Sequence, residues 1–264
     1  MRQFGWMVAL AATMISATAS AQSAFDGQWR IDLGAVKIPD RPWVVSMTGD
    51  GYRCTSCSTP WGVAADGAFH AVSGQDYFDA AAVKRIDPRT VEIHYRKAGR
   101  LVETDRISIS ADGRTLTSMD TDHATASGQP AIYRSTARRI GAAPAGSVHP
   151  LGGSWQTTSF DKGSDNTMTV TMKLAGDRFS LADGTGQHYT ATLGGPAVPV
   201  EGDIAGRTMK ATRLGARALQ LEGAIGGKAD NRMLVTIAPD GRTMNVVSTN
   251  LKLNTTTRFV ARKQ

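Results

Sequence analysis

The sequence predicts an all-β protein made of two tandem antiparallel β-barrels, and three observations lead to this prediction. Apolar and polar residues alternate along many short segments of the 264-residue chain, which is the pattern of half-buried strands. Turn signals rich in Gly and Asp separate these segments at intervals of about 8–12 residues, as in sandwiches and barrels. The second half of the chain also repeats the pattern of the first.

Residues 1–21 have the composition of a secretory signal peptide. Arg2 supplies a positive charge, residues 4–15 form an apolar run, and Ala19-Ser20-Ala21 places small side chains where a signal peptidase cleaves. The run is shorter than the roughly 20 apolar residues that a membrane-spanning helix needs, and no later segment approaches that length. We therefore expect a periplasmic or extracellular protein that is not inserted in a membrane.

Self-comparison divides the remaining chain into two related units. Matched segments recur in the same order at offsets of 124 to 128 residues, which indicates an internal duplication. We assign repeat 1 to residues 22–142, a linker to residues 143–147 within a Pro- and Gly-rich stretch, and repeat 2 to residues 148–264. The matched segments include Gly27-Gln28-Trp29 with Gly153-Ser154-Trp155, Ile107-Ser108-Ile109 with Val235-Thr236-Ile237, and Asp112-Gly113-Arg114 with Asp240-Gly241-Arg242.

Within each repeat the alternating segments follow one another as expected for hairpins. The clearest are residues 43–47, 91–95, 106–110 and 116–119 in repeat 1, and 168–172, 217–221 and 233–237 in repeat 2. Each unit is long enough for roughly eight strands of typical length, which can close into a barrel that is either filled or holds one small ligand. The alternative is one continuous sheet or sandwich formed by both repeats.

Cys54 and Cys57 are the two cysteines of the chain, and four interpretations of the pair compete. Covalent haem attachment requires a His where Ser58 stands. Structural zinc requires a second ligand pair, and a thiol–disulfide catalyst requires a helix N-terminus, whereas Pro60 follows here. In an oxidising compartment these residues therefore predict a structural disulfide that pins a loop.

Charge and motifs argue against several function classes. The 30 basic and 23 acidic residues are scattered along the chain, so we expect no nucleic-acid surface. The five histidines lie singly, which predicts no metal site. The sequence also lacks a nucleophile elbow, a zinc-protease motif, a phosphate loop and a dinucleotide fingerprint, so we predict no catalytic residues, no cofactor and no enzymatic activity.

The Gly-x-Trp at the start of each unit and the basic residues at its end resemble the lipocalin-like, or calycin, barrels. That resemblance implies a Trp at one end of the barrel with an Arg of the last strand packed across it. Trp29 would then pair with Arg138, with Arg134 and Arg139 as alternatives. Trp155 would pair with Arg262, with Arg258 as the alternative.

The chain also resembles a family of secreted bacterial proteins for which no activity is established. The shared pattern consists of Phe25-Asp26-Gly27-Gln28-Trp29, the Cys54 and Cys57 pair after Tyr52, residues 74–79, and Asp-Gly-Arg-Thr in each half. This resemblance implies export and the same fold, and it implies no reaction.

Repeat 1 carries ten of the fifteen aromatic residues that follow position 21. Several lie beside the cysteine loop, where they either line the mouth of a pocket or simply pack a long loop over the barrel end. The candidate ligand-binding residues are Trp43, Tyr52, Trp61, Tyr77 and Phe78. We expect a non-enzymatic binding protein for a small, mainly apolar molecule; the alternative is a structural or protein-interaction module of the cell envelope with solid barrels, whose protein partner the sequence does not identify.

Overall fold

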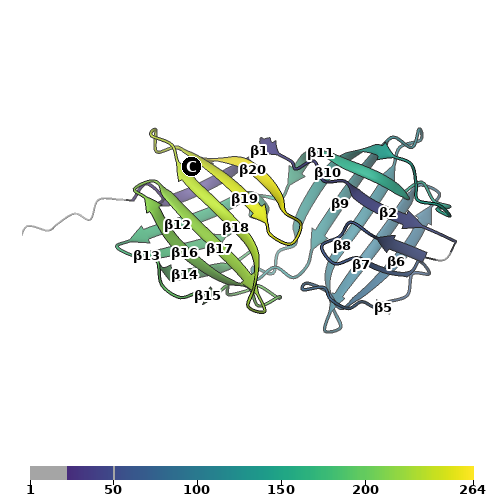
Figure 1. Ribbon diagram of the computed structural model, residues 1–264, viewed down its shortest axis with the longest axis horizontal. Helices are drawn as coiled ribbons and strands as arrows, with labels where there is room; N and C mark the ends of the chain where they lie inside the picture. Colours follow the sequence, from purple (N-terminus) through teal and green to yellow (C-terminus); the bar gives the residue numbers. More distant parts are fainter. Residues whose placement is uncertain (1–22, 50) are drawn as a thin grey trace, which may run out of the picture.

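The computed structural model describes residues 23–49 and 51–264, so the expected signal peptide lies outside the described residues. Two ten-stranded antiparallel sheets each coil into a nearly closed barrel, and the two barrels lie side by side (Figure 1). The one helix among the described residues is the single turn α1 (Asp165–Met168). The prediction of an all-β fold with two tandem barrels is therefore confirmed.

Barrel one has the strand order β4-β3-β2-β11-β10-β9-β8-β7-β6-β5. Its core is a single buried cluster that includes Val45, Ile93, Ile107 and Trp155. The strands are β2 (Trp43–Met47), β3 (Gly51–Cys54), β4 (Trp61–Ala64), β5 (His70–Ala71), β6 (Ala80–Asp87), β7 (Thr90–Lys97), β8 (Arg100–Ile109), β9 (Thr115–Asp122), β10 (Ala131–Gly141) and β11 (Gly153–Gly163).

Barrel two has the strand order β14-β13-β12-β1-β20-β19-β18-β17-β16-β15. Its core includes Trp29, Phe179, Leu221 and Ile237. The strands are β1 (Gly27–Lys37), β12 (Thr169–Ala175), β13 (Arg178–Asp183), β14 (His188–Thr192), β15 (Val198–Pro199), β16 (Thr208–Gly215), β17 (Ala218–Ile225), β18 (Lys228–Ile237), β19 (Thr243–Asn250) and β20 (Thr255–Lys263).

The two repeats exchange their first strands. Strand β1 belongs to repeat 1 in sequence but pairs with β12 and β20, whereas β11 belongs to repeat 2 and pairs with β2 and β10. In Figure 1 the purple β1 accordingly lies beside the yellow β20. This differs from the expectation that residues 22–142 and 148–264 each supply a whole barrel. Because the two first strands share the Gly-x-Trp pattern, either strand fits either barrel, the condition under which identical elements are exchanged.

The exchange changes the partners of Trp29 and Trp155, the tryptophans of the two Gly-x-Trp segments. Trp155 lies in the core of barrel one, where the guanidinium carbon of Arg139 is 4.2 Å from its ring centroid. Trp29 lies in the core of barrel two, where the Lys263 ammonium is 5.5 Å from its ring centroid. The expected pairs with Arg138 and Arg262 are therefore not formed.

Strand register explains why the neighbouring basic residues take these places. Arg139 stands directly opposite Trp155, and Lys263 directly opposite Trp29, so each pair shares a face of its sheet. Side chains alternate between the two faces, and the residue one position earlier therefore points away from the indole. Each buried indole N–H donates to a backbone oxygen four residues earlier, at 3.0 Å for Trp29 and 2.8 Å for Trp155.

The internal repeat is also visible in the pairing of the core strands. Val91 lies opposite Ile107 in barrel one, and Leu219 lies opposite Val235 in barrel two. Both pairs are buried and are 128 positions apart in the chain. Equivalent positions of the two barrels can therefore be compared residue by residue.

Candidate functional site

Barrel one contains a cavity of about 580 Å³ that opens toward barrel two. All five aromatic residues named from the sequence line it, so the structure brings the whole predicted set together. These residues are Trp43, Tyr52, Trp61, Tyr77 and Phe78. The cavity also shows that barrel one is not filled solid by its side chains.

One wall of the cavity is a continuous group of aromatic rings centred on Trp61. Its ring centroid lies 5.0 Å from that of Tyr52, 5.4 Å from Phe78 and 5.9 Å from Tyr95. Tyr95 was not among the residues predicted from the sequence. Its position in the alternation of β7, on the same face as Val91 and Ile93, would have identified it as inward-facing.

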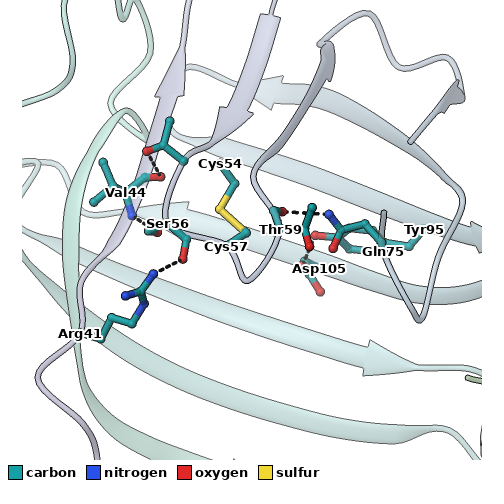
Figure 2. Close-up of a disulfide and its surroundings, with 10 residues drawn as sticks. Arg41, Val44, Cys54, Ser56, Cys57, Thr59, Gln75, Tyr95 and Asp105 are labelled. Atoms are coloured by element: carbon teal, nitrogen blue, oxygen red, sulfur yellow. Dashed lines mark hydrogen bonds between the residues drawn. A yellow bond between two sulfur atoms is a disulfide. The ribbon is translucent and has the colours of Figure 1, made fainter. Parts of the chain in front are cut away.

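Cys54 and Cys57 form the predicted disulfide, with Cα atoms 5.7 Å apart (Figure 2). The loop that they close is tied to its surroundings by hydrogen bonds on both sides. The Val44 N–H donates to the Ser56 hydroxyl at 2.7 Å, and the Gln75 side chain donates to the Thr59 carbonyl at 2.8 Å. Because Cys57 itself lines the cavity, this pinned loop forms part of the cavity wall.

Replacing both cysteines with Ser should leave barrel one folded. The closed ring spans only three positions, so the loss in unfolding free energy should be about 2 kcal/mol at most. Urea titration of the double variant measures this loss directly, and alkylation with intact-mass measurement on the wild-type protein establishes that the thiols are oxidised. Two alkylatable thiols in the wild-type protein would contradict the structural disulfide, and a collapse of the fold in the variant would contradict the predicted small loss.

A second part of the cavity wall, adjoining Tyr95, carries three carboxyl groups that the sequence analysis did not single out. Glu103 and Asp105 are inward-facing residues of β8, and Asp120 stands opposite Asp105 on β9. The Tyr95 hydroxyl donates to Asp105 Oδ2 at 2.8 Å, while Oδ1 of the same residue is buried without a hydrogen-bond partner among the described residues. The Ser118 hydroxyl donates to Asp120. The two-residue alternation of β8, in which Ile107 and Ile109 share this face, was the signal that could have revealed them.

The cavity raises the pKa of all three acids. Burial raises the pKa of Glu103 to about 7, and the charges of Asp120 and Asp122 act in the same direction. Burial, followed by the neighbouring Glu103 and Asp120 carboxylates, raises the pKa of Asp105 well above its ordinary value. Burial also raises the pKa of Asp120. Near neutral pH Glu103 therefore retains a share of protons that an exposed carboxyl would have lost.

Residues of barrel two complete the mouth of the cavity. Lys252 pairs with Asp76, and the Arg207 guanidinium lies 2.9 Å from the Asp230 carboxylate. Arg207 also donates to the Tyr77 hydroxyl at 2.6 Å. Tyr77 and Arg207 line a second, smaller cavity of about 320 Å³ in barrel two, so this pair forms a partition between the two cavities.

Comparison of the chain with protein-family models, with curated proteins and with solved structures found no match. Within residues 23–49 and 51–264, no group of three or more His, Cys, Asp or Glu side chains has an arrangement suited to a metal ion. No helix of that part of the chain is long and apolar enough to cross a membrane.

Proposed function

We propose that this protein is an exported, non-enzymatic binding protein that holds a small ligand with a mainly apolar body in the cavity of barrel one. The observation that supports this proposal is the aromatic wall of a cavity of about 580 Å³. Cavities of this size in proteins commonly hold small molecules, and aromatic side chains supply large apolar contact areas.

The construction of the wall also favours binding. The rings of Trp61, Phe78 and Tyr95 contact one another, and the disulfide loop is fixed by hydrogen bonds on both sides. A wall held in place before the ligand arrives loses little conformational entropy on binding, which increases affinity.

Native mass spectrometry of the protein purified from its own host compartment tests the proposal. We expect a bound small molecule, and we expect the melting temperature to rise with ligands from a panel of lipids and metabolites. A ligand-free protein that no member of the panel stabilises would contradict the proposal and would favour a module that interacts with other proteins.

A pair of variants assigns the binding to this cavity. Phe78→Ala removes a ring from the cavity wall and should weaken binding about tenfold or more, as expected for the loss of one buried aromatic contact. Phe69→Ala removes the same ring from a half-buried position under Arg96, outside the cavity lining, and should leave affinity unchanged. Equal affinities for the two variants would place the ligand elsewhere.

A further inference from the structure

The polar part of the barrel-one cavity holds three acidic side chains that no basic residue of the described chain pairs with. None of the Glu103, Asp105 and Asp120 carboxylates forms an ion pair with a basic residue of the described chain. In addition, Asp105 Oδ1 is buried without any hydrogen-bond partner among those residues. A buried carboxylate oxygen without a partner is costly, and a partner supplied by a ligand would remove that cost.

The cations at the cavity mouth do not serve as that partner. Arg207 contacts Asp203 and Asp230, and Lys252 contacts Asp76 and Asp230. These two basic side chains are therefore already surrounded by three carboxylates of their own. The acids deeper in barrel one remain without a counter-ion.

The acids are not required by the barrel fold, because the duplicated barrel lacks them. Ile93 and Leu221 occupy the same position in their barrels. Asp105 stands opposite Ile93, and Met233 stands opposite Leu221, so Asp105 and Met233 are equivalent. By the same comparison Glu103 corresponds to Asn231 and Asp120 to Ser248. Barrel two thus folds with neutral side chains at all three positions.

The aromatic wall and the acidic wall meet at Tyr95. Its ring centroid lies 4.8 Å from that of Phe78, and its hydroxyl donates to Asp105 at 2.8 Å. Aromatic faces attract cations as well as apolar groups, and the attraction is strongest away from water. A ligand that touches both walls therefore binds most tightly when it combines an apolar body with a positive charge.

We infer that the ligand of this cavity is an organic cation, an amine or quaternary ammonium compound whose charge lies against Glu103, Asp105 and Asp120 while its apolar body packs on Trp61 and Phe78. This inference rests on the proposed function and specifies the class of ligand.

Matched probes test the charge requirement on the full mature chain. Benzyltrimethylammonium is a permanent cation, neopentylbenzene is its neutral carbon isostere, and phenylacetate is an anion with the same ring. By tryptophan fluorescence titration at pH 8, the cation should bind about thirtyfold or more tightly than either of the others, as expected for a buried charge pair. Tighter or equal binding of the neutral or anionic probe would overturn the cationic assignment and leave the proposed binding function standing. Failure of all three probes, together with ligand-free native protein, would overturn both.

A charge-matched pair of variants locates the cation. Asp105→Asn should reduce affinity for benzyltrimethylammonium toward that of neopentylbenzene. Glu92→Gln removes one negative charge from the outer face of β7, where Glu92 pairs with Arg106, and should leave affinity unchanged. Equal effects of the two variants would overturn the assignment, and so would stoichiometric Ca²⁺ binding that Asp105→Asn abolishes.

The same assignment predicts a pH profile that a merely structural role would not produce. Because the probe cation does not titrate, its affinity should rise between pH 5.5 and pH 8 as the pKa near 7 of Glu103 is crossed, with release of protons. The titratable and charged groups that face the acids are Tyr95 of β7, Tyr52 of β3, Asp122 of β9, Tyr133 of β10 and, at the mouth, Asp76, Tyr77, Arg207, Asp230 and Lys252. A flat profile would overturn the assignment.

Folding of the test variant is checked by its stability at the same pH. A carboxyl whose pKa is raised by folding contributes stability below its unfolded pKa and loses it as the pH rises through the folded value. The Asn side chain of Asp105→Asn does not ionise, so the variant does not lose stability as the pH rises. At pH 8 the melting temperature of the variant should therefore equal or exceed that of the wild type. A lower melting temperature would instead show that Asp105 stabilises the fold without a ligand, which contradicts the inference.

Discussion

Replacing Trp155 by Ala should unfold barrel one and leave barrel two folded. The indole is 1 % exposed, donates to the Leu151 carbonyl and lies under the Arg139 guanidinium. Truncating a buried Trp to Ala typically costs about 3–5 kcal/mol, which is a large part of the stability of a domain of this size. The side chain comes from repeat 2, yet the damage should appear in the barrel built mostly from repeat 1.

Hydrogen exchange measured by mass spectrometry separates the two barrels. For Trp155→Ala, protection should be lost in residues 43–163 and retained in residues 169–263. The matched variant Trp29→Ala removes an equally buried indole from the equivalent position of repeat 1, and its loss of protection should appear in barrel two. If Trp155→Ala destabilised the barrel built mostly from repeat 2, and Trp29→Ala the barrel built mostly from repeat 1, the strand exchange would be wrong.

The alternation of side chains and the internal repeat were sufficient to predict the barrels. Segments such as residues 233–237 do form strands, because β-branched and apolar residues at every second position cover one buried face. The disulfide was also predictable, since Cys54 and Cys57 have no other partners in the chain.

Strand exchange could not be predicted, and the same property of the sequence explains why. Gly27-Gln28-Trp29 and Gly153-Ser154-Trp155 present the same face pattern, so either strand satisfies either core. The choice between them depends on the connections at residues 38–42 and 164–168, whose course a local pattern does not determine. The partners of the two tryptophans followed from that choice.

The aromatic residues of the candidate site were predicted from the sequence, whereas its acidic residues were not. Aromatic residues stand out in a sequence, and the five that were named all line one cavity. Glu103, Asp105 and Asp120 did not stand out, because polar residues in an alternating strand are usually assigned to the solvent face. Only the position of Asp105 two residues before the buried Ile107 distinguished the inner face from the outer one.

Engineered disulfides should reveal the exchanged arrangement directly. Gln28 and Thr171 are exposed and stand opposite each other on β1 and β12, so Cys at both positions should link nearly completely within one chain. Intact-mass measurement would show the loss of two hydrogen atoms, and peptide mapping would identify the new bond beside the native Cys54–Cys57 disulfide.

The control for this experiment comes from the repeat itself. If β1 stayed with its own repeat, Gln28 would take the place of Ser154, which stands opposite Val44. Cys at positions 28 and 44 should therefore remain as free thiols, because in the exchanged structure these residues belong to different barrels. Since the two pairs share one position and differ only in the partner strand, a link at 28–44 with none at 28–171 would overturn the exchange. A link at 28–171 would show that the connections at residues 38–42 and 164–168 both pass from one barrel to the other. These two connections join the barrels covalently. At the cavity mouth, the hydrogen bond between Arg207 and Tyr77 joins the same two barrels.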